Sequence, residues 1–232
     1  MWRSIINCSA LSKTATISDI IKNQLPSKFN SSYEAFSKRN GEKTNAGIIF
    51  TPIARNSHHP TEYDAMSLQL RLFDRFPELG VDCYFSSTPD DCEEASWKEK
   101  IRKSARNFKN NEINLLVATK AYGMGIDKSN IRYTIHDGLP SSIEQFYQEA
   151  GRAGRDRNHS ECVLVFSNDN ANINEEMLDP ALSIDEFLEK YEVYKDKFKY
   201  DGKDDLSSVL FFHNSNFKGV QNECDTIAKS GS

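Results

Sequence analysis

Short apolar segments alternate with segments of helical periodicity through most of this 232-residue chain. The apolar segments have the length and side-chain bulk of buried strands, and most are followed by a stretch whose apolar residues recur every three or four positions. Such alternation favours a mainly parallel sheet with helices on both faces, so we predict an α/β, three-layer fold. The expected strands are residues 3–9, 47–51, 81–85, 113–118, 131–137 and 161–166.

The first expected helix begins at a capping residue, either Thr16 or Ser18, and stops before Pro26. Serine and threonine are favoured helix caps, and a proline disfavours helical backbone in the residue that precedes it. Residues 27–46 are polar and turn-rich, and we interpret them as an inserted loop without an assignable role.

Three further helices are expected, over residues 62–75, 93–109 and 143–150. Apolar spacing predicts the buried face of the first two. The expected buried residues are Met66, Leu70 and Phe73 in the first helix, and Trp97, Ile101, Ala105 and Phe108 in the second.

The strand at 113–118 ends in Thr119, which precedes a loop containing Gly123, Gly125 and Asp127. Ligands of open α/β sheets bind beyond the carboxyl ends of the strands. The hydroxyl of Thr119 is therefore placed to meet a phosphate. The carboxylate of Asp127 is placed to meet a ribose or an arginine.

Residues 148–155 read Gln-Glu-Ala-Gly-Arg-Ala-Gly-Arg and place Arg152 and Arg155 three positions apart, each after a glycine. Glycine permits a tight turn, and guanidinium forks suit phosphate oxygens. Phosphoryl transfer is catalysed largely by positive charge placed where negative charge develops. The alternative interpretation is two surface arginines that follow a helix.

Together these two segments resemble helicase motifs V and VI of the RecQ-like DNA helicases, which belong to superfamily 2. Residues 47–52 resemble motif IV, and residues 131–136 resemble the strand between motifs V and VI. The resemblance covers about residues 45–168 and favours RecQ over the DEAD-box RNA helicases. The latter usually carry His-Arg at the positions of Gln148 and Glu149.

The resemblance implies the second of two RecA-like lobes, with ATP bound between them. The resemblance implies that Arg152 and Arg155 reach the ATP phosphates. It implies that Gln148 couples the γ-phosphate to closure of the lobes. Asp127 is expected to meet the ribose or to hold Arg152. Gly125 is expected beside the nucleotide. The residues expected to grip one DNA strand are Thr51, Arg55, Thr119, Lys120, Gly123 and Met124.

The phosphate-binding loop of such enzymes, Gly-x4-Gly-Lys-Ser/Thr, is missing. The nearest candidate, residues 40–44, has Glu42 in place of the required glycine, and no Asp-Glu-x-His pair for magnesium occurs. We therefore expect ATP and Mg²⁺ to be bound mainly by an absent first lobe. The expected partners of this chain are that first lobe, single-stranded DNA and duplex junctions. This chain alone should be inactive. A non-catalytic nucleic-acid or protein docking module and an RNA helicase lobe are the alternatives.

The net charge of −5 is unevenly distributed. Residues 98–132 contain nine basic and three acidic residues, whereas residues 156–232 contain eight basic and 16 acidic residues. Local rather than net charge governs contact with phosphates, so the basic region suits nucleic acid. The alternative for residues 98–109 is simply the solvated face of a helix.

The five cysteines are scattered and form no Cys-x-x-Cys pair, so we expect neither zinc nor any other metal, and we interpret His58 and His59 as an exposed loop. No apolar stretch is long enough to span a membrane, and the first residues are too polar for a signal peptide. We expect a cytoplasmic protein, nucleoid-associated in a bacterium or nuclear in a eukaryote. The predicted domains are 1–172, the lobe, and 173–232, an acidic and mostly helical extension with helices at 183–200 and 206–219.

Overall fold

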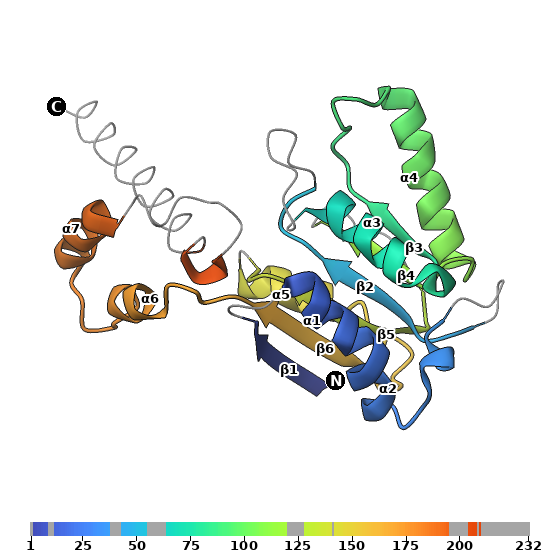
Figure 1. The fold of residues 1–232 in the computed structure, drawn as a ribbon, viewed down its shortest axis with the longest axis horizontal. Coiled ribbons are helices and arrows are strands. Elements are labelled where there is room, and N and C mark those ends of the chain that lie inside the picture. The colour runs from blue at the N-terminus through green and yellow to red at the C-terminus, as the bar shows by residue number, and fades with distance from the viewer. Residues whose placement is uncertain are drawn as a thin grey trace, which may run out of the picture. The chain divides into compact units, whose positions relative to one another are not determined.

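A computed structural model describes residues 2–8, 12–37, 43–54, 64–119, 128–140, 142–194, 204–207 and 209 (Figure 1). The chain divides into two compact units, Met1–Phe166 and Ser167–Ser232.

The first unit is built on a six-stranded sheet in the order β1-β6-β5-β2-β4-β3, and every neighbouring pair is parallel. This confirms the predicted fold class. The strands agree with the expected segments to within two residues at each end. They are β1 Trp2–Asn7, β2 Ala46–Phe50, β3 Val81–Tyr84, β4 Leu115–Ala118, β5 Ile131–Asp137 and β6 Glu161–Phe166.

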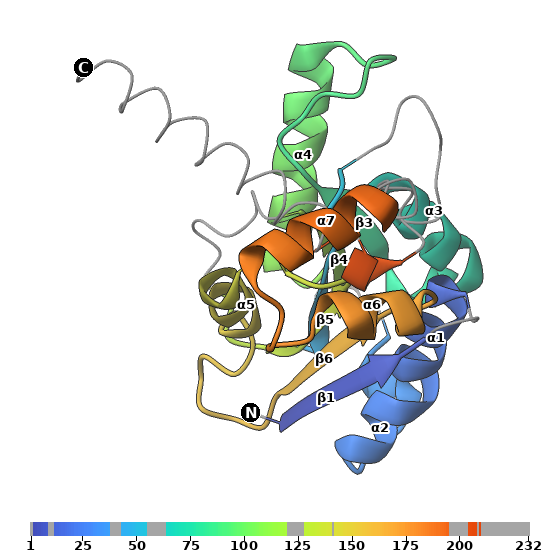
Figure 2. The ribbon, with the colours of Figure 1, turned by 90° about the vertical axis from the view of Figure 1, so that its left-hand side faces the viewer.

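Helices cover both faces of this sheet, as Figure 2 shows. On one face lie α1 (Lys13–Asp19), α2 (Leu25–Lys28) and α3 (Ala65–Arg75), and on the other lies α5 (Ile143–Ala150). The long helix α4 (Glu94–Lys109) packs beside the edge strand β3. Two buried apolar clusters, one on each side of the sheet, result from this three-layer arrangement.

The expected first helix is wrong at both ends. Ser12 caps α1, and its side chain accepts a hydrogen bond from the amide of Ala15. The chain then stays helical through Pro26, because a π-helical segment at Ile20–Gln24 leads into α2 with Pro26 in its first turn. Proline is tolerated in a first turn, where no intrahelical acceptor is needed for its missing N–H.

The predicted buried face of α3 is wrong for two of its three residues. Leu70 and Phe73 are exposed, whereas Met66 is partly buried and packs against the core. The buried residues of α3 are Ala65, Leu68 and Leu72. Both sets have helical spacing, and packing on the sheet selects the second.

The segment interpreted as an inserted loop contributes to the core. Tyr33–Ala35 form a 3₁₀ turn, and the ring of the fully buried Phe36 packs 5.8 Å from that of Tyr133 on β5. Tyr133 in turn requires Gly47 on β2, because a Cβ atom at position 47 would lie 2.0 Å from its ring.

The second unit contains α6 (Ala171–Met177) and α7 (Ile184–Tyr194), which pack through Met177 and Tyr191. The hydroxyl of Tyr194 donates to Glu176, and Lys190 pairs with the same carboxylate. Helix α7 lies within the expected helix at 183–200, of which residues 195–200 lie outside the described part. Of the expected helix at 206–219, only residues 206, 207 and 209 are described.

Candidate nucleotide and nucleic-acid site

Two of the predicted site residues, Thr51 and Thr119, follow neighbouring strands. Strands β2 and β4 pair in register up to Phe50 and Ala118, so both end at the same height of the sheet. The amide of Thr51 donates to the carbonyl of Ala118 at 2.9 Å. The structure therefore brings the two threonines together at the carboxyl edge.

The side chains of these two threonines differ in availability. Thr51 is buried, and its hydroxyl donates to the carbonyl oxygen of Ile53 at 3.0 Å. Thr119 is only partly buried, and its amide donates to the carbonyl of Tyr84. A ligand beyond the strand ends would thus meet the side chain of Thr119 more readily than that of Thr51.

Helix α5 displays one of the predicted residues to solvent. The helix begins at Ser142, whose side chain accepts from the amide of Gln145 at 3.1 Å. Gln148 is exposed, whereas the next two residues, Glu149 and Ala150, are buried. The polar side of α5 therefore presents the Gln148 amide, and the opposite side anchors the helix on the sheet.

The two predicted arginines lie in the turn that follows α5. Gly154 has a φ of 71°, and a Cβ atom there would lie 2.6 Å from the hydroxyl oxygen of Ser160. Its amide donates to the carbonyl of Ile131, the first residue of β5, at 3.0 Å. Arg155 is exposed and Arg152 is partly buried. The turn is thus fixed in place at the amino-terminal end of β5, at the opposite end of the strands from Thr51 and Thr119.

An ion pair anchors the end of this turn. The guanidinium of Arg132, on β5, binds both carboxylate oxygens of Asp156, with Nη1 2.9 Å from Oδ1. The hydrogen bond from Arg132 holds the pKa of Asp156 well below its ordinary value. The sequence does not indicate this pair, because the position of Arg132 at the start of a strand does not reveal a partner 24 residues away.

A second pair that the sequence analysis missed joins α5 to β5. Nδ1 of His136 lies 3.1 Å from Oε2 of Glu149, and both side chains are buried. The side-chain amide of Gln145 donates to the other carboxylate oxygen at 2.7 Å. The rings of Phe50 and Phe146 flank the imidazole, at centroid distances of 5.4 and 4.9 Å.

Burial opposes the charged form of His136. The neighbouring Cys162 and Glu149 groups favour that form, and together they raise the pKa of His136 above its ordinary value. The pair therefore favours a protonated imidazole under the helix that leads to the arginine turn.

The remaining predicted residues lie outside the described part of the chain. They are Arg55, Lys120, Gly123, Met124, Gly125 and Asp127. His58 and His59 also lie outside it. Within the described ranges, no group of three or more His, Cys, Asp or Glu side chains is arranged to hold a metal ion. No helix in those ranges is long and apolar enough to cross a membrane.

Comparison with known families assigns the fold. Residues 27–157 match the model of the helicase conserved C-terminal domain. The chain belongs to this family. The match includes β2 to β5, the threonine pair and the arginine turn.

Relatives of this helicase C-terminal domain include RecQ proteins. An alignment of 174 residues is 38% identical to the ATP-dependent DNA helicase RecQ of Bacillus subtilis (strain 168) and covers 68% of this chain and 28% of that protein. The RecQ of Pasteurella multocida (strain Pm70) is 37% identical over 126 residues, which are 54% of this chain and 17% of that protein. The chain thus spans less than a third of the length of these relatives, and it is a RecQ-like C-terminal helicase lobe.

A solved structure supports the fold alone. Domain 2 of the DEAD-box helicase Mss116p, bound to an RNA duplex, superposes with a TM-score of 0.54 at 16% identity. The superposition covers 90% of this chain and 86% of that domain. At this identity the match shows a RecA-like lobe and says nothing of the ligand of this chain.

Proposed function

We propose that this chain is the second lobe of an ATP-dependent DNA helicase and that it completes the ATP site from the side opposite the phosphate-binding loop. The observation that carries the proposal is the arginine turn. The amide of Gly154 donates to Ile131 of β5, and Arg132 pairs with Asp156, so the turn carries the exposed residue Arg155 on a rigid base. A preorganised cation is what phosphoryl transfer requires.

The residues present fit the phosphates of a nucleotide. Arg155 and Arg152 would bind the phosphate oxygens, and one of them would neutralise charge that develops at the γ-phosphate. Gln148, exposed one turn earlier on α5, would couple this contact to closure of the two lobes. Asp127 and Gly125 are proposed beside the ribose. ATP supplies the phosphoryl group that is transferred to water, and Mg²⁺ is assigned mainly to the first lobe.

The strand ends would hold one DNA strand by its backbone. Thr119 is the better placed of the two threonines, because the hydroxyl of Thr51 already donates to Ile53. Thr51 would instead shape the turn beyond β2. Arg55, Lys120, Gly123 and Met124 complete the proposed set. Because such a grip reads no bases, binding should show little sequence preference and strong salt dependence.

The whole protein would then act on single-stranded DNA and duplex junctions, in the cytoplasm of a bacterium or the nucleus of a eukaryote. Opening and closing of the cleft between the lobes would move the strand. Alone, this chain should not hydrolyse ATP, and no zinc is assigned to it.

The test is DNA-stimulated ATP hydrolysis by a protein that carries both lobes. Arg155→Lys should leave nucleotide affinity nearly unchanged and lower the stimulated rate by roughly 10³-fold or more. Arg157→Lys is the matched control, because Arg157 is exposed in the same turn and has no assigned role. Wild-type turnover in Arg155→Lys would remove Arg155 from the site. Stimulation by RNA and not by DNA would favour an RNA helicase lobe, and a parent chain without a phosphate-binding loop would favour a docking module.

A further inference from the structure

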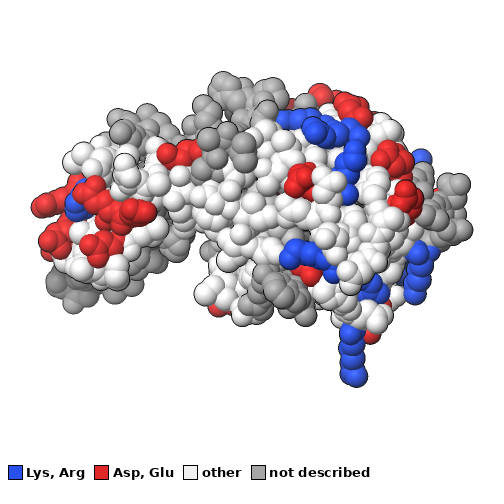
Figure 3. Space-filling model, turned by 60° about the horizontal axis from the view of Figure 1, so that its bottom comes forward, with Lys and Arg blue, Asp and Glu red and all other residues white. Residues whose placement is uncertain are grey.

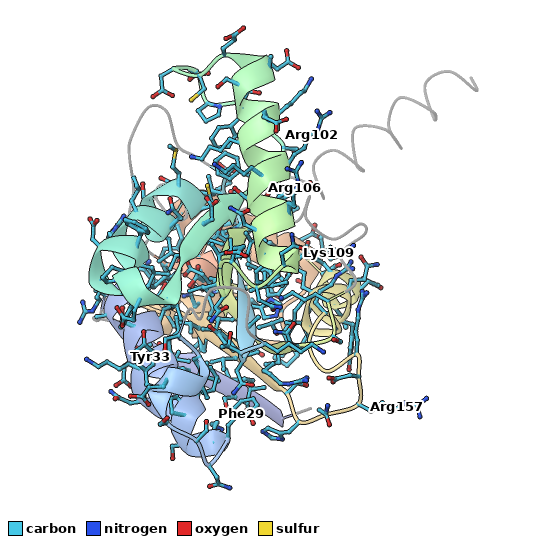
Figure 4. All side chains as sticks on the ribbon, turned by 90° about the vertical axis from the view of Figure 1, so that its right-hand side faces the viewer. Phe29, Tyr33, Arg102, Arg106, Lys109 and Arg157 are labelled. Atoms are coloured by element: carbon cyan, nitrogen blue, oxygen red, sulfur yellow. The ribbon has the colours of Figure 1, made fainter. Side chains whose placement is uncertain are left out.

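Three basic side chains form a stripe on the exposed side of α4: Arg102, Arg106 and Lys109. With 3.6 residues per turn and a rise of 1.5 Å, they fall within an arc of about 60° and span about 10 Å along the helix axis. Figure 4 shows all three on one side of α4, the side turned away from α3. We call this set the α4 stripe.

The charge of the α4 stripe is not neutralised within the described residues. None of its three cations forms an ion pair there, and residues 100–109 contain no Asp or Glu. Two other cations of α4 are engaged: Lys98 pairs with Glu94, and Lys100 lies 4.9 Å from the ring of Trp97. The stripe is therefore available to a negatively charged ligand.

The fold accounts for only part of the stripe. Helix α4 is held by Trp97 and Phe108 on its buried side and by a hydrogen bond from Ser104 to Asp82. Cations in a last turn interact favourably with the helix dipole, which explains Arg106 and Lys109. Arg102 lies a turn earlier and gains little from that effect.

The chemistry of this surface suits nucleic acid better than a protein partner. Protein interfaces have a core rich in aromatic and apolar groups, whereas the neighbours of the stripe on the exposed side, Lys98, Glu99 and Lys103, are charged. Arg102 and Arg106 are about 6 Å apart along the helix axis. Successive phosphates of one DNA strand rise by about 3.4 Å along the duplex axis, and their direct separation is larger. The two guanidinium groups can thus contact two phosphates of one strand.

Figure 3 shows mainly acidic side chains on the second unit, whereas the first unit carries both basic and acidic side chains. The described residues of the second unit include ten acidic side chains and a single basic one, Lys190. The stripe belongs to the first unit, and the acidic unit offers no comparable basic surface among its described residues.

We propose that the α4 stripe binds the phosphate backbone of nucleic acid, at a place separate from the strand ends of β2 and β4. The inference rests on the proposed function, because it assumes that the chain binds DNA. It adds a contact on the outer edge of the sheet, where the stripe would engage either the duplex or a continuation of the single strand. Binding there should be independent of sequence.

The test is a titration of this chain with a fluorescent single-stranded oligonucleotide and with the corresponding duplex, followed by anisotropy between about 50 and 200 mM salt. Arg102→Gln/Arg106→Gln should reduce the slope of log affinity against log salt by about 1.8 for the duplex or about 1.4 for the single strand, because two phosphate contacts are lost. Arg102→Glu/Arg106→Glu should lower affinity further, with circular dichroism to verify folding.

The matched control is Lys22→Gln/Arg75→Gln, which removes the same charge from exposed residues outside α4. It should leave the slope nearly unchanged. An effect confined to one oligonucleotide supports the inference and identifies the bound form. Equal effects of the stripe and control variants would overturn the inference while leaving the proposed function intact. A wild-type chain that binds neither oligonucleotide would overturn the proposed function itself.

Discussion

Glu149 of α5 and His136 of β5 form a buried pair, with Oε2 of the carboxylate 3.1 Å from Nδ1 of the imidazole. The pair lies in the same helix as Gln148 and one residue before the Ala150 at which α5 ends. It therefore ties the helix that leads into the arginine turn to the centre of the sheet. The free energy that the pair contributes to folding depends on the charge of the imidazole, so the pH dependence of stability tests the pair.

Glu149→Gln should destabilise the first unit by about 1–3 kcal/mol near pH 6, because a hydrogen bond to a buried charged group is weakened. The pKa of His136 is raised above its ordinary value of 6.5 in the folded chain. Stability from the pair is therefore full below about pH 6.5 and is lost as the pH rises through the raised pKa. The difference in unfolding free energy between wild type and variant, measured by urea denaturation, should shrink towards alkaline pH.

Glu144→Gln is the control for this experiment, because Glu144 is an exposed carboxylate of the same helix. Its effect on stability should be within about 0.5 kcal/mol at every pH. If Glu149→Gln and wild type showed parallel pH profiles, the pair would not carry the charge that we assign to it.

Gly154→Ala should distort the arginine turn. The position has a φ of 71°, and the added methyl group would lie 2.6 Å from the Ser160 hydroxyl. Left-handed backbone costs an L-residue about 1–2 kcal/mol, and the contact adds to that cost. Thermal unfolding should show the loss, and the protein with both lobes should lose DNA-stimulated hydrolysis while it retains DNA affinity. Full stability in this variant would contradict the tight turn.

Gly47→Ala should destabilise the sheet through Tyr133. The new methyl group would lie 2.0 Å from the fully buried ring, and overpacking of a core costs about 1–3 kcal/mol. A double-mutant cycle with Tyr133→Leu supplies the control, since the smaller side chain removes the clash. Additive effects of the two changes on stability would show that the close approach of Gly47 and Tyr133 is not the reason why position 47 excludes a larger residue.

Thr119→Ala should weaken binding of single-stranded DNA about 3- to 10-fold, the effect of one lost hydrogen bond, without changing ATP affinity. Thr16→Ala is the matched control, because Thr16 is also a partly buried residue, and its hydroxyl donates within the same segment to the carbonyl of Ser12. An unaltered DNA titration for Thr119→Ala would count against the grip proposed at the strand ends.

Much of the fold could be predicted from the sequence because the spacing of apolar residues differs between strands and helices. Segments such as 131–137, 143–150 and 161–166 agree with β5, α5 and β6 at both ends. The face of α3 could not be predicted, since Met66-Leu70-Phe73 and Ala65-Leu68-Leu72 are both spaced for a helix. The course through Pro26 depends on a π-helical segment, which has no sequence signature of its own.

The candidate site was predictable in part for a related reason. Glycine and arginine at fixed spacing indicate a turn that displays cations, so Arg152 and Arg155 could be selected from local sequence. The groups that hold this turn come from elsewhere in the chain: Arg132 and Ile131 lie on β5, and Ser160 precedes β6. Contacts between distant segments follow from the order of strands in the sheet, which local patterns do not contain.

The most direct test compares DNA-stimulated ATP hydrolysis by a first lobe that carries the phosphate-binding loop, measured alone and joined to this chain. We expect the first lobe alone to show no stimulation by DNA, the joined protein to be stimulated, and Arg152→Lys/Arg155→Lys in the joined protein to abolish the gain. A joined protein that hydrolyses ATP at the same stimulated rate with both arginines replaced would contradict the account.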